Sequence, residues 1–419
     1  MNFRPNPLLY AANEDFFSAF RIALPLRFEV DHAVLSQAVK KAMKRYPYFC
    51  VRPQRQGNEI ILTSNTQELP VFPDARSVTL GTEQSNYHLL TFGCEKNTIF
   101  IDASHYIADG MGIDPLMKTV LYLYVSALYG EDGLAKERIR MPDDHVSEEE
   151  YEYPFPSETI GLENALLLPK ASGDVYTVDP AAFDDGGLYA YHLHIPQKPM
   201  MAKANTSDGS PVSFLSVMLY RAMCALDGKI ERPVVVHVQH QYRSALNVWK
   251  SHHSLVNYLP IVFSPRISTW DVERQNTTVR GQTIIGTEKD TDLAAINHFL
   301  SSMAPVDASL EEKKRAAVAY VDESICGKTF GISYVGKMDW CGLDKYVEDI
   351  HAYIGEKHTK NMILIEVMTI GEDFSVNFMQ SGKGEKYLQA FIDQLKESDV
   401  PVSLIGEERY TLCNTRIPE

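Results

Sequence analysis

A β-rich run that leads through a histidine-bearing turn into a long amphipathic helix constrains this chain more than any other stretch. Residues 98–103 read Thr-Ile-Phe-Ile-Asp-Ala, and the polar turn that follows holds His105, Asp109 and Gly110. From Ile113 onward, apolar residues recur on one stripe with the helical period. Because rigid scaffolds hold reactive side chains at strand ends, we expect the turn with His105 to belong to a functional site.

Length and composition predict two domains. The 419 residues are too many for one typical hydrophobic core, and 45% hydrophobic with 23% charged residues is ordinary for a globular protein. Small, acidic and glycine residues cluster at 174–187, just before a strand expected at 188–195. We therefore expect an N-terminal domain over 1–180, which carries the histidine turn, and a C-terminal domain over 181–419.

Charge and cysteine usage exclude several classes of partner. The formal net charge is −15, and no basic tract has the density that phosphate binding requires, so we expect no nucleic-acid partner. The six cysteines form no Cys-x-x-Cys pair, which argues against a zinc site or a disulfide framework. Histidines that are adjacent or alternate along the chain lack a carboxylate or cysteine pattern, so we interpret them as surface or strand residues and expect no metal: His252 and His253, His192 and His194, and His237 and His240.

The N-terminal sequence lacks the continuous apolar core of a signal peptide, and no run of about 18 apolar residues occurs. We therefore expect no membrane span and a cytoplasmic location. The acidic, proline-bearing stretch at 131–160 is predicted to be a solvated surface excursion, with a lid or partner-docking loop as the alternative.

Periodicity predicts an α/β (α+β) fold. The first helix should begin at an Asp31 cap, and another at Ser210-Pro211, where a cap precedes proline in the first turn. A helix containing Tyr387 is expected to end the chain. The remaining predicted strands lie near 22–30, 50–52, 59–63, 233–239, 362–370 and 374–380, and the remaining helices near 113–128, 278–303 and 309–325.

The pattern His105-x-x-x-Asp109-Gly110, between a strand and a helix about a quarter of the way along the chain, resembles the signature of the chloramphenicol-acetyltransferase-like superfamily. That superfamily includes CoA-dependent alcohol acyltransferases and the condensation domains of nonribosomal peptide synthetases. The resemblance implies two chloramphenicol-acetyltransferase-like subdomains, each a mixed β-sheet flanked by helices, with an active-site tunnel between them. Condensation domains usually carry a second histidine where this chain has Ser104, so the sequence is nearer to the alcohol acetyltransferases.

The second half of the chain contains two further matches. Arg243 and Asn257 correspond to an arginine and an asparagine in the Asn-Leu-Arg and Gly-Asn segments of these acyltransferases, although their neighbours here differ. The run from Ser333 to Gly336 looks like the family's Ser-Asn-x-Gly segment, with Tyr334 in place of the asparagine. The resemblance therefore extends over essentially the whole chain.

The resemblance implies a role for each matched residue. His105 would be the general base, the alternative being a histidine that is only hydrogen-bonded at a strand end. For Asp109 we favour an ion pair with Arg243 over a helix cap or a triad partner of His105. Ser333 is either a donor to the tetrahedral intermediate or an ordinary strand serine.

The remaining matched residues have backbone roles in this interpretation. Gly110 would allow a close turn and offer its N–H to the oxyanion, and Gly336 would allow close backbone approach. Asn257 is expected to stabilise a turn rather than to touch substrate.

The implied reaction is direct acyl transfer in a ternary complex, from a thioester to a hydroxyl or amine of a small-molecule acceptor. The expected co-substrate is acyl-CoA, with no permanently bound cofactor. An acidic acyl or peptidyl carrier protein is the alternative donor, but it would be repelled by a chain of this charge. Two other functions stay open: a stand-alone condensation domain, and a catalytically silent relative that only binds or scaffolds.

Overall fold

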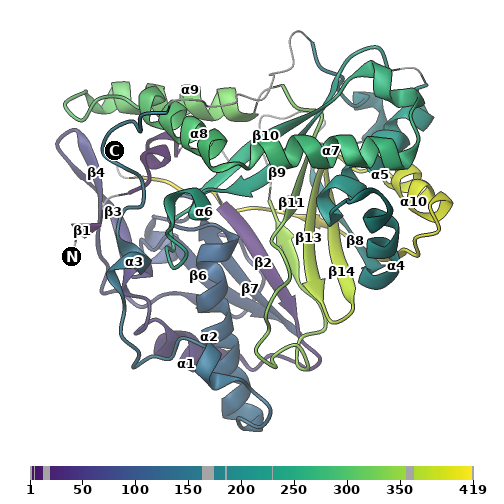
Figure 1. Ribbon diagram of the computed structural model, residues 1–419. Coiled ribbons are helices and arrows are strands. Elements are labelled where there is room, and N and C mark those ends of the chain that lie inside the picture. The colour runs from purple at the N-terminus through teal and green to yellow at the C-terminus, as the bar shows by residue number, and fades with distance from the viewer. Residues whose placement is uncertain are drawn as a thin grey trace.

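The computed structural model describes residues 2–3, 5–12, 19–162, 174–184, 186–228, 230–325, 327–354 and 363–417, and it shows a mixed α/β protein built on two large sheets (Figure 1). Cys326, residue 185 of the predicted boundary cluster and the first residue of the strand expected from 362 lie outside these ranges. Each large sheet is mixed, because it combines antiparallel strands with at least one parallel pair. The predicted fold class is confirmed.

The first large sheet has the strand order β12-β2-β7-β6-β5, and a smaller sheet has the order β1-β4-β3. Helices α1 and α2 pack against each other beside the first large sheet (Figure 1). The strands and helices of this half are β1 (Asn2–Phe3), β2 (Ala19–Pro25), β3 (Val51–Gln56), β4 (Glu59–Ser64), β5 (Val71–Phe72), β6 (Leu90–Glu95), β7 (Thr98–Ser104), β12 (His351–Tyr353), α1 (His32–Ala42), α2 (Gly110–Tyr129) and α3 (Glu148–Tyr151).

The second large sheet has the order β10-β9-β11-β13-β14-β8-β15, and Figure 1 shows α4, α5, α7 and α10 gathered on one side of it. Their apolar faces and that side of the sheet form a separate hydrophobic core. The elements are β8 (Leu188–Pro196), β9 (Val234–Gln241), β10 (Val256–Phe263), β11 (Phe330–Tyr334), β13 (Ile363–Ile370), β14 (Asp373–Ser381), β15 (Ser403–Tyr410), α4 (Gln197–Ala204), α5 (Pro211–Asp227), α6 (Arg243–Leu246), α7 (Val272–Gly286), α8 (Lys289–Ser302), α9 (Leu310–Ile325) and α10 (Lys386–Glu397).

Short 3₁₀ helices occur at several connections: η1 (Pro7–Ala11), η2 (Pro47–Phe49), η3 (Glu83–Ser85), η4 (Lys136–Arg138), η5 (Pro180–Ala182), η6 (Asn205–Ser207) and η7 (Pro265–Thr269). No single helix in the described ranges is long and apolar enough to cross a membrane, although Gln197–Ser207 and Pro211–Asp227, bent by 86°, pass a test of length and composition when taken together. The five cysteines with described positions, Cys50, Cys94, Cys224, Cys341 and Cys413, are free.

Helix starts that are set by capping chemistry agree with the sequence prediction. Asp31 accepts hydrogen bonds from the backbone N–H groups of the first turn of α1, and Ser210 does the same for α5 with proline in the first turn. The helix expected over 278–303 is wrong as a single element, since α7 ends and α8 begins around Thr287 and an extended Glu288. One short break inside a continuous periodic pattern leaves little trace in the sequence.

The strands that the sequence analysis did not predict include β6 inside the first large sheet and two edge strands, β15 and β12. The chain does not end in a helix as predicted, because β15 follows α10 and pairs with β8. Its side chains are mostly exposed, so they follow no apolar alternation. The short strand β12 comes from the second half of the chain and pairs with β2 in the first large sheet. The domain boundary expected at residue 180 stays a prediction. β12 follows that boundary in the sequence but pairs within the first large sheet.

Candidate active site

His105 directly follows β7, a strand paired on both sides within the first large sheet. Its ring lies 4.5 Å from the Phe20 ring, centroid to centroid. It lines a cavity of about 400 Å³ whose other lining residues come from both large sheets and from the start of α2. Burial lowers the pKa of His105 to about 4, although the charge of Asp109 and a hydrogen bond with the Ala108 backbone act in the opposite direction. The imidazole is therefore neutral at pH 7 and able to accept a proton.

Asp109 is the N-cap of α2 and also one half of a buried ion pair. Its Oδ1 accepts a hydrogen bond from the Gly112 N–H at 2.8 Å. Both terminal nitrogens of Arg243 donate hydrogen bonds to the same carboxylate, at 2.7 Å to Oδ2 and 2.8 Å to Oδ1. The Leu255 N–H adds a bond of 3.0 Å to Oδ2. Two of the expected roles thus coexist, and the carboxylate is engaged by these three residues rather than by His105, which disfavours a triad.

The Arg243 guanidinium also organises the loop between α6 and β10. Its Nη2 donates to the carbonyl oxygens of Ser251 at 3.1 Å and His253 at 2.9 Å. Only 1% of its side chain is exposed, so every one of these bonds is formed away from water. A single side chain therefore ties the loop at 251–255 to the turn that carries His105.

Gly112 and His252 complete this junction, and sequence reasoning assigned no role to either. A Cβ at Gly112 would lie 2.1 Å from the His252 carbonyl oxygen, so only glycine lets the loop approach α2 this closely. The His252 Nδ1 hydrogen-bonds the Ile107 carbonyl at 2.8 Å. The interpretation of His252 and His253 as surface or strand residues was wrong, because both are buried in a loop. Adjacent histidines carry no periodic signal that distinguishes a buried loop from an exposed one.

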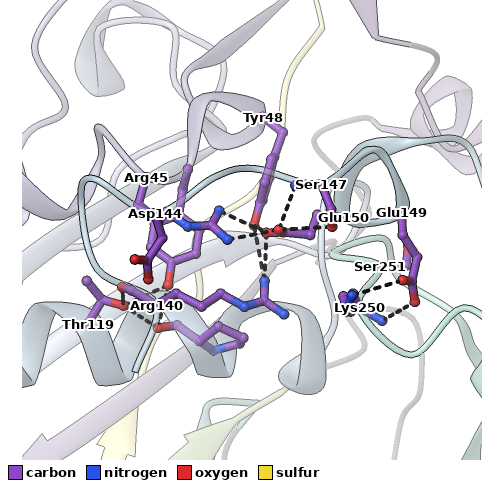
Figure 2. Close-up of polar contacts among 12 residues, drawn as sticks. Arg45, Tyr48, Thr119, Arg140, Asp144, Ser147, Glu149, Glu150, Lys250 and Ser251 are labelled. Carbon is purple, nitrogen blue, oxygen red and sulfur yellow. Dashed lines mark hydrogen bonds and ion pairs between the residues drawn. The ribbon is translucent and has the colours of Figure 1, made fainter. Parts of the chain in front are cut away.

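His252 packs against a buried cluster of charged residues around Glu150, which Figure 2 shows. Arg45 reaches both carboxylate oxygens of Glu150 at 2.9 and 2.8 Å, and Arg140 reaches Oε2 at 2.9 Å. The Tyr48 hydroxyl donates to the same oxygen at 3.0 Å, and the Tyr48 ring stacks on the His252 ring at 4.5 Å. Hydrogen bonds from Arg45 and the Ser147 backbone, together with the charges of both arginines, lower the pKa of Glu150 to about 2 against the opposing effect of burial.

The acidic stretch at 131–160 is therefore not simply a solvated excursion, as the sequence indicated. Glu150 is 2% exposed, and its backbone carbonyl accepts the His252 N–H at 3.0 Å. The neighbouring Glu149 pairs with Lys250 near the surface, as Figure 2 also shows. Charge runs are usually solvated. Of the two arginines that pair with Glu150, Arg140 belongs to the same stretch and Arg45 lies about 100 residues earlier in the chain.

Ser333 lies at the end of β11, opposite Glu366 on β13. The two side chains are hydrogen-bonded at 2.7 Å between Ser333 Oγ and Glu366 Oε1, and both line the cavity. Burial raises the pKa of Glu366 to about 8. Glu366 was missed, although a lone glutamate inside the apolar run Ile-Leu-Ile-Glu-Val-Met is a visible signal for a buried ionisable group.

The remaining sequence-predicted residues divide into two groups. Gly110 and Gly336 line the cavity, and Gly336 has a φ of +87°, the backbone region that favours glycine. Asn257 was wrongly expected at a turn. It lies inside β10 opposite His240 and is not among the residues that line the cavity. Among the residues that the structure places, no group of three or more histidine, cysteine, aspartate or glutamate side chains is arranged to hold a metal ion.

Neither known protein-family models nor curated proteins match this sequence, but the fold has counterparts among solved structures. TRI101 of F. graminearum, in a structure with coenzyme A and deoxynivalenol, is 13% identical with a TM-score of 0.60, over 95% of this chain and 97% of that one. Polyketide synthase associated protein 5 of Mycobacterium tuberculosis is 13% identical with a TM-score of 0.57, over 93% and 96%. The condensation domain of the Monacolin K polyketide synthase MokA is 11% identical with a TM-score of 0.53, over 93% and 94%. The chain thus has the two-lobed fold that these structures share.

Proposed function

We propose that this chain, a member of that fold group, is an acyltransferase that moves an acyl group from a thioester to a hydroxyl or amine of a small-molecule acceptor. The observation that carries the proposal is the position of His105. A neutral imidazole stands at the end of a central strand and faces a cavity lined by both lobes. General bases of this kind contribute roughly 10²- to 10⁴-fold to rate.

The proposed chemistry needs a general base and hydrogen-bond donors that stabilise an oxyanion. The His105 imidazole takes the proton of the acceptor hydroxyl or amine as its oxygen or nitrogen bonds to the thioester carbonyl carbon. The carbonyl oxygen becomes an oxyanion in the tetrahedral intermediate, for which Ser333 and the backbone near Gly110 are the proposed donors. When the C–S bond breaks, the proton on His105 passes to the leaving thiolate, so the free thiol departs and the imidazole is neutral again.

Free acyl-CoA is the proposed donor. Carrier proteins of this type are acidic, and a net charge of −15 opposes their docking unless a local basic patch exists. The sequence contains two short basic clusters, Lys40-Lys41 with Lys44-Arg45 and Lys313-Lys314-Arg315, and several of these charges have acidic partners. Lys40 is paired with Glu68, and Lys313 is buried against Glu59. Relatives with the same fold have been crystallised with coenzyme A, as TRI101 has.

One assay tests the proposed acyl transfer together with its two alternatives, a condensation-type enzyme and a catalytically silent protein. Purified protein is given acyl-CoA thioesters with pooled alcohols and amines, and the release of free thiol is followed. We expect acceptor-dependent release that falls at least 100-fold in His105→Ala, in line with the contribution of a general base. His145→Ala, at an exposed position, should retain full activity.

More than about a tenth of the activity in His105→Ala would contradict the base assignment. Faster turnover from the same acyl group on a carrier protein, at matched concentration, would favour a condensation-type enzyme. Absence of transfer from either donor would favour a binding or scaffold protein.

A further inference from the structure

Glu366 is a buried carboxylate that faces the cavity and has no role yet in the proposed reaction. It lies on β13, between β11 and β14 in the interior of the second large sheet, and is 3% exposed. Its neighbours Ile365 and Val367 point into the hydrophobic core, so alternation along the strand turns Glu366 and Met368 toward the cavity. Its Oε1 is bonded to Ser333, and its Oε2 has no hydrogen-bond partner among the residues that the structure describes.

Among the residues that the structure describes, no cation balances a charge on Glu366, whose pKa responds only to burial and to the hydrogen bond with Ser333. Of the charged groups that line the same cavity, Arg243 is bound to Asp109 in a bidentate pair. His240, on β9, is bonded to Asp292, and burial raises the pKa of Tyr334. The other facing groups are Asn377 on β14 and, behind it on β12, His351, whose pKa is lowered to about 4 by burial and the nearby His192. A buried carboxyl without a counter-charge takes up a proton rather than remain ionised, and burial accordingly raises the pKa of Glu366 to about 8.

The protonation state of Glu366 decides what Ser333 can do. A hydroxyl has a single proton to donate. An ionised Glu366 can only accept, so it would consume the Ser333 proton. A protonated Glu366 can donate from Oε1 to the Ser333 oxygen, and the Ser333 proton is then free to point into the cavity.

We infer that Glu366 is a positioning residue whose protonated carboxyl donates to Ser333 Oγ, leaving the Ser333 hydroxyl to donate to the oxyanion of the tetrahedral intermediate. This inference rests on the proposed acyl transfer. It assigns complementary states to two ionisable groups that line the cavity, because His105 is neutral and ready to accept a proton while Glu366 keeps its own. Raising the pH through the pKa of Glu366 withdraws the donor although His105 is unchanged.

The activity test compares pH profiles of the wild type with Glu366→Gln and Ser333→Ala. The wild type should lose activity as pH rises past about 8. The glutamine amide can donate to Ser333 at any pH, so Glu366→Gln should stay within about threefold of the wild type at pH 7 and lose the alkaline decline. Ser333→Ala should lose about 10²- to 10³-fold, the usual effect of removing one oxyanion donor. An alkaline decline that persists in Glu366→Gln, or a loss of more than 100-fold at pH 7, overturns the inference.

Infrared spectroscopy provides a readout that does not depend on activity. At pH 6 the wild type should show a carbonyl stretch of a protonated carboxylic acid that is missing in Glu366→Gln, shifts in Ser333→Ala, and disappears between pH 7 and pH 9. Absence of that band at pH 6 contradicts the inference. If the band behaves as expected but no acyl donor is turned over, the proposed function fails while the hydrogen bond from Glu366 to Ser333 stands.

Stability supplies a third readout with a defined sign. The folded state binds the Glu366 proton more tightly than the unfolded chain, whose glutamate titrates near 4.5. The free energy of unfolding of the wild type should therefore fall relative to that of Glu366→Gln as pH rises from 5 to 8. An equal pH dependence in the two proteins contradicts a protonated Glu366.

Discussion

Asp109 and Arg243, 134 residues apart in the chain, meet as a bidentate ion pair in which neither side chain is more than 2% exposed. The pair joins the turn that carries His105 to the loop at 251–255, so it connects the two halves of the chain at the cavity. A charge buried this deeply is tolerated because Gly112 and Leu255 satisfy the carboxylate and two carbonyl groups satisfy the guanidinium. Stability and site geometry therefore depend on the same contact.

Removing Arg243 should destabilise the protein as well as inactivate it. Arg243→Ala leaves Asp109 buried without its counter-charge, which costs about 3 to 5 kcal/mol in the free energy of unfolding. Arg76→Ala is the matched control, because its pair with Asp74 lies at the surface, where such pairs contribute about 0 to 1 kcal/mol. Chemical denaturation measures both. Equal stability in the two variants would show that the Asp109 pair is dispensable for folding.

Gly112→Ala tests the close contact between α2 and the loop that follows α6. The new Cβ would meet the His252 carbonyl oxygen at 2.1 Å, so the loop or the helix start must move. We expect a loss of about 1 to 3 kcal/mol, typical of overpacking, together with reduced acyl transfer. Gly281→Ala lies in α7 with open space around its Cβ and should be neutral or stabilising. A Gly112→Ala protein as stable and active as the wild type would contradict the proposed role of this glycine.

Glu150→Gln tests whether the charge cluster in Figure 2 supports the site from a distance. The charge-assisted hydrogen bonds to Arg45 and Arg140 weaken, and we expect a loss of about 1.5 to 3 kcal/mol at pH 7. Glu149→Gln, the adjacent residue with an exposed partner, should change stability far less.

The stability difference between the wild type and Glu150→Gln should depend on pH in a defined direction. The folded-state pKa of Glu150, about 2, lies below the ordinary value of 4.5, so its stabilisation is complete above pH 4.5 and is lost as pH falls toward 2. Thermal denaturation should therefore show the difference between the wild type and Glu150→Gln shrinking below pH 4.5. A difference that stays constant down to pH 3 would mean that the carboxylate charge is not what stabilises the cluster.

The pH profile of acyl transfer should report the lowered pKa of His105. The imidazole remains neutral above about pH 4, so kcat/KM should be nearly constant between pH 7 and pH 5.5. An unperturbed histidine, with a pKa of about 6.5, would lose most of its activity over that range. Circular dichroism at each pH separates this effect from unfolding. An acidic inflection near pH 6.5 in a folded protein would mean that the pKa of His105 is not lowered.

Local chemistry in the sequence was sufficient for much of the fold and for part of the site. Capping residues such as Asp31 and Ser210 mark helix starts because their side chains bond backbone groups only two or three residues away. The succession of a β-rich run, a polar turn and an apolar stripe placed His105 at a strand end, as observed. The family resemblance, which rests on a few spaced motif residues, also predicted the ion pair between Asp109 and Arg243 that the structure shows.

Tertiary structure alone decided which polar groups are buried and with what partners. Glu150 appears in an ordinary acidic run, and only the packing of Arg45 and Arg140 around it makes it a structural anchor. Gly112 looks like a flexible neighbour of the motif until the His252 carbonyl is placed against it. Glu366 acquires its raised pKa and its bond to Ser333 from neighbouring strands that are distant in sequence. Burial and long-range pairing depend on how separate segments pack, which local sequence patterns do not encode.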